Sequence, residues 1–236
     1  LGSGTLIAPN WVLTAAHMVD DIMSGTVTFG ATEYAAESWV AHSKWNGDLL
    51  KGNDIALIKL TTEVVGIDAA VRYTGSDELG KTGTAVGYGM GGTGETGAVT
   101  AAGTKRAGDN VIDAFYGGKG KKAPNIFLSD FDNPGYPGDS AYGSSTPLPL
   151  EYLIAPGDSG GGVFIDINGE FVLAGVNSFG ASFDGNTNSD YGDVSGHTRV
   201  SEFNKWIDDT IAGGGGGKGG GKGNGKGGGK PSMFES

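Results

Sequence analysis

The sequence predicts an all-β fold that ends in one short α-helix and a disordered Gly/Lys-rich tail. Short runs of β-branched and aromatic residues alternate with Gly, Asn and Asp turns along most of the 236 residues, which is typical of all-β proteins. Helical spacing of apolar residues begins at residue 201. A chain of this length, 37% hydrophobic, can form one large domain or two small ones.

The first predicted elements are two short strands within residues 5–16, which a turn at Pro9-Asn10 joins. His17 follows directly, where the apolar run ends. A single histidine is more often structural than catalytic. One at the end of a buried strand, however, has its ring fixed by the core and its edge exposed, as a general base requires.

β-Structure is expected to continue over residues 26–41, and His42 then opens a polar stretch in which we expect a loop histidine. Asp54 leads directly into the alternating apolar strand of residues 55–60, so its carboxylate should be drawn inside. A buried carboxylate is costly unless it is paired or hydrogen-bonded. The imidazole of His17 is a suitable partner.

Two glycine motifs resemble nucleotide-binding loops, and their context argues against that function. Residues 75–82 match G-x-x-x-x-G-K-[ST], and residues 87–92 match G-x-G-x-x-G. Neither is followed by a helix-forming segment, and such loops work only at a helix N-terminus. We expect a polar hairpin at 75–82, and surface loops over 93–125 around one short strand near 110–115.

Two loops concentrate oxygen ligands, residues 130–133 and residues 184–190. The second repeats Asp or Asn at every other residue, as calcium loops do, with the candidate ligands Asp184, Asn186, Asn188 and Asp190. It lacks the central glycine and final glutamate of the helix-loop-helix calcium motif. Asx-rich turns without a metal are the alternative.

The octapeptide of residues 155–162, Ala-Pro-Gly-Asp-Ser-Gly-Gly-Gly, carries the main functional signal. A serine on a glycine-rich turn, close to backbone N–H groups, suits nucleophilic attack on a carbonyl. A surface turn is the simpler alternative, because Gly, Asp and Ser favour turns. Catalysis therefore requires a base and an orienting acid elsewhere.

After two further strands, at 171–180 and 197–200, the helix is expected to start with Ser201 as N-cap and to stop at Gly213. Residues 213–236 then form a second unit, a flexible tail beyond the domain of residues 1–212. The tail carries Lys218, Lys222, Lys226 and Lys230 among glycines, so it cannot bury apolar surface. A tether and a contact with an acidic polymer are both compatible with it.

Composition excludes several classes of function. There is no cysteine, which excludes disulfides, thiolate metal sites and a thiol nucleophile. The formal net charge is −11; removing the tail's four lysines and one acid leaves −14 for residues 1–212. Such a domain should repel nucleic acid. No run approaches membrane-spanning length and no signal peptide is present, and because Leu1 is not methionine we expect an upstream segment.

Four segments resemble the signatures of chymotrypsin/trypsin-like serine peptidases, and the cysteine-free, glycine-rich style is closest to secreted bacterial members. The segments are Gly4-Thr5-Leu6-Ile7, Leu13-Thr14-Ala15-Ala16-His17, Asn53-Asp54-Ile55-Ala56-Leu57 and Gly157-Asp158-Ser159-Gly160-Gly161. The resemblance extends from about residue 1 to residue 211. It implies two six-stranded antiparallel β-barrels with the site between them, and a first strand upstream of this chain.

The resemblance also assigns roles. Ser159 would attack the scissile carbonyl, His17 would act as base and then acid, and Asp54 would orient the imidazole. The N–H groups of Gly157 and Ser159 would form the oxyanion hole, in which one donor contributes roughly 3 kcal/mol. Asp158 would be the activation anchor that pairs with a newly formed N-terminus.

Substrate-binding residues are expected on two segments. Ser178, Phe179 and Gly180 resemble the edge that pairs with the substrate backbone, with Phe179 in place of the usual tryptophan. Leu153 occupies the position that is aspartate in trypsin-type enzymes, and Ile154 follows it. An apolar floor leaves a basic side chain without a counter-charge, so apolar residues before the cut are expected. Asn177 and His197 are expected near the pocket, where a histidine would suit a glutamate-preferring enzyme instead.

The sequence thus predicts a secreted serine endopeptidase, a monomer that acts on proteins or peptides and requires no cofactor. A catalytically silent binding module that keeps the barrels is the alternative. Such relatives usually lose a member of the triad, whereas this chain retains all three residues.

Overall fold

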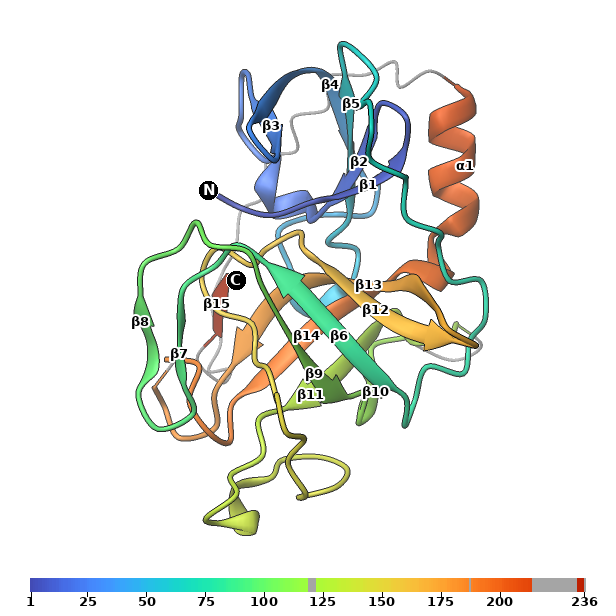
Figure 1. Ribbon diagram of the computed structural model, residues 1–236. Helices are drawn as coiled ribbons and strands as arrows, with labels where there is room; N and C mark the ends of the chain where they lie inside the picture. The colour runs from blue at the N-terminus through green and yellow to red at the C-terminus, as the bar shows by residue number, and fades with distance from the viewer. Residues whose placement is uncertain (119–121, 187, 214–232, 236) are drawn as a thin grey trace.

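The computed structural model describes residues 1–118, 122–186, 188–213 and 233–235. Within them, two antiparallel sheets each curl into a half-barrel, and one helix lies beside them (Figure 1). The first sheet has the strand order β1-β2-β5-β4-β3, with β1 at Thr5–Ala8, β2 at Trp11–Thr14, β3 at Thr26–Phe29, β4 at Thr32–Ala41 and β5 at Ala56–Leu60.

The second sheet has the order β10-β11-β14-β13-β12-β6-β9, and β15 pairs with β13 outside this path. Its strands are β6 (Thr82–Gly87), β9 (Arg106–Val111), β10 (Ala114–Tyr116), β11 (Ile126–Asp130), β12 (Gly162–Ile167), β13 (Glu170–Ala181), β14 (Val194–Arg199) and β15 (Met233–Glu235). A separate hairpin joins β7 (Gly91–Thr93) to β8 (Gly97–Thr100).

The predicted all-β class is confirmed, whereas the count of six strands per barrel is matched only in part. Among the described residues the first sheet has five strands and the second has eight. The loops expected over 93–125 contain more β-structure than predicted. The expected single strand near 110–115 is two strands, β9 and β10, and a hairpin precedes them.

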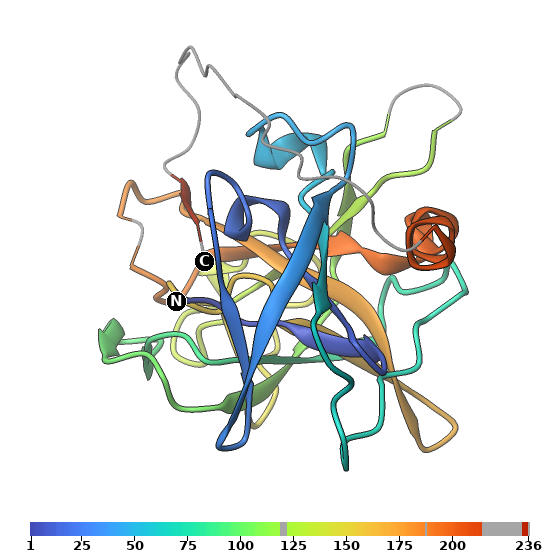
Figure 2. The same cartoon turned by 90° about the horizontal axis from the view of Figure 1, so that it is seen from above.

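One apolar core joins the two sheets to the helix. Leu13 of β2 and Leu57 of β5 pack in one cluster with Leu173 of β13, and with Phe203 and Ile207 from the helical segment. The helix α1 (Asn204–Ala212) is seen end-on at the side of the sheets in Figure 2. Because each sheet buries one face in a shared core, the loops at their junction are held in place from both sides.

The helix ends as predicted at Gly213 but does not begin with a Ser201 cap. A 3₁₀ turn, η4 (Val200–Glu202), precedes it, and Phe203 occupies the N-cap position without a side-chain hydrogen bond. The Ser201 hydroxyl instead donates to Glu78 Oε1 at 2.8 Å. A tertiary partner has therefore replaced the local cap that the sequence suggested.

The expected polar hairpin at residues 75–82 is a loop that runs into β6, with a turn at Leu79-Gly80. Its Glu78 is fully buried and pairs with Arg199, Oε2 to Nη2 at 2.7 Å. The loop therefore turns one carboxylate inward, where a cation from β14, far along the chain, offsets its charge.

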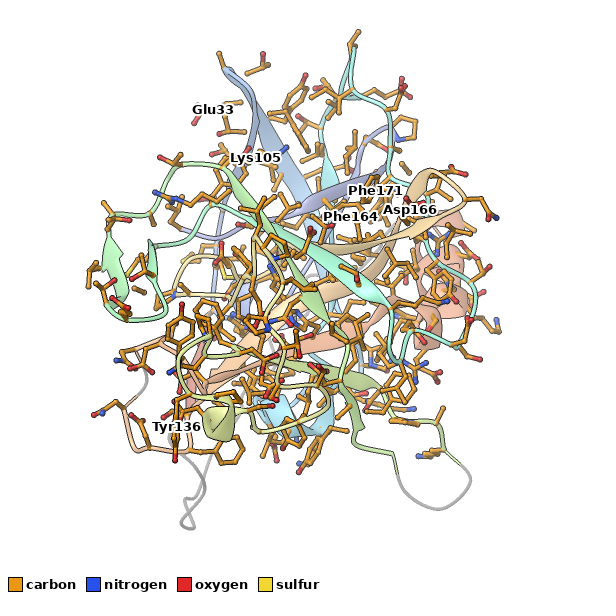
Figure 3. All side chains as sticks on the ribbon, turned by 60° about the horizontal axis from the view of Figure 1, so that its bottom comes forward. Glu33, Lys105, Tyr136, Phe164, Asp166 and Phe171 are labelled. Atoms are coloured by element: carbon orange, nitrogen blue, oxygen red, sulfur yellow. The ribbon has the colours of Figure 1, made fainter. Side chains whose placement is uncertain are left out.

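The remaining short elements are three 3₁₀ turns, η1 (Ala16–Met18), η2 (Leu49–Lys51) and η3 (Pro137–Asp139). In Figure 3, Glu33 on β4 and Tyr136 on the loop before η3 mark opposite ends of the molecule. No helix in the described part of the chain is long and apolar enough to cross a membrane.

Candidate active site

Sheet register brings His17 and Asp54 together. Strands β2 and β5 are antiparallel neighbours in which Thr14 pairs with Ala56. His17 lies in η1, just after β2 ends, and Asp54 lies just before β5 begins. The two residues therefore lie at the same end of these paired strands. Local sequence alone was enough to place each of them at a strand end.

The three predicted catalytic residues form a continuous hydrogen-bonded series. His17 Nδ1 lies 2.7 Å from Asp54 Oδ2, and His17 Nε2 lies 2.7 Å from Ser159 Oγ. Asp54 is 0% exposed and Ser159 is 1% exposed, and the His17 side chain is 6% exposed. A carboxylate, an imidazole and a hydroxyl in this order can move a proton from the hydroxyl to the ring.

Additional donors hold the buried Asp54 carboxylate. The backbone N–H of His17 donates to Oδ1 at 2.9 Å, and the Ser178 hydroxyl donates to Oδ2 at 2.6 Å. Thr198 Oγ1 donates to the Asp54 carbonyl at 2.9 Å. The first two bonds compensate the desolvation of the charge and fix the carboxylate against the ring, while the third holds the backbone of Asp54. Sequence reasoning placed Ser178 on the substrate edge and missed this contact of its side chain.

The turn that carries Ser159 depends on its glycines. Gly157 has φ +100° and Gly160 has φ +81°, angles that other residues rarely adopt. A Cβ on Gly160 would also collide with the Ser3 carbonyl and with Thr14. Ser3 binds this turn through two hydrogen bonds. Its N–H donates to the Ser159 carbonyl at 2.7 Å, and its hydroxyl donates to the Gly157 carbonyl at 3.1 Å. The N-terminal segment thus supports the proposed nucleophile.

Asp158 is buried beside this turn, and backbone groups bind its carboxylate. Gly89 N–H donates to Oδ1 at 2.8 Å and Ala155 N–H donates to Oδ2 at 2.9 Å. Burial raises the pKa of Asp158 above its usual value. A Cβ on either Gly87 or Gly89 would collide with this carboxylate. The glycines of the G-x-G pattern that resembled a dinucleotide loop therefore leave room for the Asp158 carboxylate. The role of Asp158 in activation stays a prediction.

The expected specificity residues are all buried. Leu153 is 7% exposed and Ile154 is 0% exposed. The Ile154 N–H donates to Ser195 Oγ at 3.1 Å, which ties this segment to β14. Apolar side chains and a neutral hydroxyl group therefore gather at the predicted floor of the pocket.

Asn177 and His197 face each other inside the second sheet. His197 Nδ1 lies 3.0 Å from Asn177 Oδ1, and the ring packs against Phe127 with centroids 5.0 Å apart. Asn177 Nδ2 donates to the Asp158 carbonyl at 3.2 Å, behind the Ser159 turn. Burial lowers the pKa of His197 to about 3, so the ring is neutral. Its geometry fits a structural role better than recognition of an acidic substrate.

The expected substrate edge lies beside the Ser159 turn. Strand β12 pairs with β13 only as far as Gly162 opposite Val176, so β13 continues past the end of its neighbour. Phe179 and Gly180 lie in this continuation and pair with β14 on the other side. Phe179 is 2% exposed, with its ring packed over Gly196. Its backbone, rather than its ring, is thus the part suited to meeting a peptide.

The candidate calcium loop is organised by hydrogen bonds within itself. Asp184 accepts from the Ser182 hydroxyl at 2.6 Å and from Asn186 N–H at 2.7 Å, and Asn188 donates to Asp190 at 2.8 Å. No three His, Asp or Glu side chains of the described residues are grouped to hold a metal ion. Calcium binding here stays a prediction, and the hydrogen bonds correspond to the Asx-turn alternative.

His42 is a loop residue, as predicted, and it packs against the helix. Its ring stands edge-on to Phe203 and Trp206, with centroids 5.0 Å and 5.2 Å away. Burial lowers its pKa, with the charge of Lys44 as a smaller cause.

The oxygen-rich stretch of residues 130–133 forms an acidic cluster with Asp113, and the sequence did not predict this partner. Asp130 is 1% exposed, and its Oδ2 accepts from the N–H groups of Ala141 and Tyr142 at 2.5 Å and 2.9 Å. Burial, together with the neighbouring charge of Asp130, raises the pKa of Asp113 to about 8. The ordinary value is 3.8, so a folded protein keeps this proton where an unfolded chain has lost it.

The stability that this protonated group provides should decline as the pH rises. It is present in full below pH 4 and is lost on the way to pH 8, because only the unfolded state ionises in between. We expect the effect of Asp113→Asn on the free energy of unfolding to be more favourable at pH 9 than at pH 5, by about 1–2 kcal/mol. This range is smaller than the full pKa shift implies, because solvent reaches the group and screens its charge. Urea unfolding at both pH values measures this, with the exposed Asp68→Asn as control. An equal effect at both pH values would contradict the assignment.

Two curled antiparallel sheets, with a Ser–His–Asp series where they meet, define the class of trypsin-like serine peptidases. The comparisons with known proteins agree with this class. The model of the Trypsin family matches residues 1–207, so this chain belongs to the trypsin family.

Individual relatives fall within the same family. Chymotrypsin-like elastase family member 1 of Canis lupus familiaris is 29% identical over 233 residues, which covers 89% of this chain and 80% of the relative. Chymotrypsin-C of Bos taurus is 40% identical over 72 residues, or 26% of each chain. These relatives are mammalian, so the expected closeness to secreted bacterial members is not confirmed.

The fold is also found in a solved structure, described as neuropsin, a serine protease expressed in the limbic system of mouse brain. It matches with a TM-score of 0.65 at 19% identity and covers 89% of this chain and 88% of its own. At that identity the likeness supports the fold alone.

Proposed function

We propose that this protein is a serine endopeptidase that hydrolyses peptide bonds through an acyl-enzyme. The observation that carries the proposal is the unbroken series from Asp54 through His17 to Ser159, with both links at 2.7 Å. Membership of the trypsin family supports it, since that family makes a hydrolase the expected class.

The reaction follows from the positions of these groups. Ser159 Oγ attacks the scissile carbonyl as His17 Nε2 takes its proton, and the imidazolium is stabilised by Asp54. His17 then returns the proton to the leaving amine, which departs and leaves an ester on Ser159. Water, deprotonated by His17, hydrolyses that ester and regenerates the serine. Backbone N–H groups of Gly157 and Ser159 are proposed to stabilise the oxyanion.

A serine-directed phosphonylating reagent tests this function. We expect one adduct, mapped to Ser159 by mass spectrometry, and no adduct in His17→Ala, because the hydroxyl needs its base. A folded protein that takes up no reagent would instead be the catalytically silent binding module.

For specificity, we propose a preference for apolar residues before the cut. The side chains predicted to form the floor, Leu153 and Ile154, carry no counter-charge themselves, and leaving a basic side chain unpaired beside them costs several kcal/mol. The buried, neutral His197, bonded to Asn177, makes the glutamate-preferring alternative less favourable. The observations thus favour a chymotrypsin- or elastase-like preference over a trypsin-like one.

Profiling of a peptide library measures this preference. We expect kcat/KM for apolar residues to exceed that for arginine or lysine by on the order of 10²-fold or more, because an unpaired charge would be desolvated. Leu153→Asp should narrow this ratio, while the neutral Leu153→Asn should not. Dominant cleavage after Arg or Lys by the unmodified protein would contradict the role of Leu153.

We further propose that the protein acts outside the cell, as a monomer, on protein or peptide substrates. The proposed chemistry needs no cofactor, because the serine, imidazole and carboxylate supply the nucleophile and the proton transfers. The net charge of −11 makes nucleic acid an unfavourable partner.

A further inference from the structure

Strand β15 lies on the part of β13 that we propose binds substrate. Met233, Phe234 and Glu235 pair antiparallel with Ala181, Gly180 and Phe179, respectively. Figure 1 shows β15, in dark red, beside the second sheet. The far end of the chain therefore returns to the neighbourhood of Ser159.

This pairing occupies the one stretch of β13 that its other neighbours leave open. On one side, β14 pairs with residues 175–181 of β13. On the opposite side, β12 pairs with β13 only from Glu170 to Val176. Asn177 still bonds to the Ser159 turn on that side, through Gly160 N–H and the Gly161 carbonyl. Beyond Asn177 that side of the strand has unused hydrogen-bonding groups unless another strand adds to it. Among the described residues, β15 is the strand that does so.

The direction of β15 follows from its pairing with β13. Because it is antiparallel to β13, it runs from Ala181 back to Phe179, toward Ser178. The Ser178 hydroxyl is bonded to Asp54, which in turn holds His17. A chain entering along β15 therefore advances toward the catalytic series. Addition of a strand to a sheet edge uses backbone groups and needs no particular sequence.

We infer that the C-terminal segment is an intramolecular inhibitor, which occupies the substrate-binding edge of this same domain. The inference rests on the proposed peptidase function. Residues 214–232 connect α1 to β15, and a Gly-rich chain of about 20 residues has a root-mean-square span of roughly 25 Å. Tethering at that length gives an effective concentration of millimolar order. A weakly binding segment can thus compete with substrate.

Amide hydrogen exchange tests the contact without relying on catalysis. The full chain is compared with a chain ending at Ala212 and with Phe234→Pro, which removes a backbone N–H from the added strand. Phe234→Ala keeps that N–H, and Gly220→Pro places a proline outside the strand. We expect faster exchange within residues 179–181, which pair with β15, in the shortened chain and in Phe234→Pro only. Equal protection in all five proteins would overturn the inference.

Steady-state kinetics then tests the inhibition. Removing a tethered competitor lowers KM and leaves kcat unchanged, and we expect about a tenfold rise in kcat/KM for the shortened chain. A synthetic peptide of residues 231–236 should inhibit that chain competitively. The same KM in the shortened chain and in the full chain would contradict inhibition by the C-terminal segment. A loss of hydrolysis by every variant would instead refute the proposed peptidase, while hydrogen exchange would still decide whether the segment is bound. Intact-mass measurement confirms that the segment is retained during the assay.

Discussion

Replacement of Ser159 by alanine is expected to lower kcat by about 10⁶-fold, the scale at which removing a nucleophile abolishes covalent catalysis. His17 Nε2 is bonded to Ser159 Oγ at 2.7 Å, so this hydroxyl is the one placed to give its proton to the base. The protein should remain folded, because the substitution removes one small atom. Hydrolysis of an apolar peptide substrate measures the loss, and the exposed Ser144→Ala is a matched control.

Because the three residues act as a unit, their effects should not add. His17→Ala combined with Ser159→Ala should be little slower than Ser159→Ala alone. Asp54→Asn is expected to lower kcat by about 10⁴-fold, since it no longer holds the productive tautomer of His17. Less than a tenfold loss for Ser159→Ala would exclude it as the nucleophile.

Glu78→Gln should lower the free energy of unfolding by about 3–5 kcal/mol, the range for breaking one side of a buried ion pair. Glu78 and Arg199 are 0% and 2% exposed. Arg199 Nε and Nη2 donate to the two carboxylate oxygens at 3.1 Å and 2.7 Å, and the guanidinium lies 4.1 Å from the centre of the Phe115 ring. The neutral amide would leave the buried arginine charge with the weaker compensation of the partly exposed Glu202 carboxylate, 3.7 Å away.

Urea unfolding of Glu78→Gln and of Asp209→Asn compares the loss of a charge from a buried pair with the same loss from an exposed pair. The exposed pair of Lys205 and Asp209 is the comparison, and Asp209→Asn should cost less than about 1 kcal/mol. Replacing both buried partners, as Glu78→Leu with Arg199→Met, should recover much of the loss, because no unpaired charge remains. A Glu78→Gln protein within about 1 kcal/mol of the original would show that the pair is dispensable.

Much of the candidate site could be predicted because its signals are local. His17 and Asp54 each stand at the end of an apolar strand, and Ser159 stands on a glycine turn, so alternation and turn chemistry indicate them directly. The all-β class and the helix end at Gly213 follow from the same short-range patterns. Family resemblance added the order of the three residues, which local patterns do not supply.

Apart from the pairing of His17 with Asp54, the contacts between distant segments could not be predicted, because no local pattern encodes which buried group meets which. Ser178 was expected on a substrate edge, and its hydroxyl is on Asp54. Ser201 was expected to cap a helix, and it binds Glu78. The raised pKa of Asp113 comes from its burial and from the charge of Asp130 at the end of β11. In each case the partner of the polar group comes from a segment that lies close only in the folded protein.

The amino-acid sequence by itself determined the fold class and the chemical identity of the site, because alternation, turns and glycine angles act over a few residues. Tertiary structure alone decided how the site is supported and what lies on its edge. The burial of Asp158 against Gly87 and Gly89, the pairing of Glu78 with Arg199 and the addition of β15 to β13 all join segments far apart in the chain. Buried charges and open strand edges are costly until a partner satisfies them, and packing decides which partner does so.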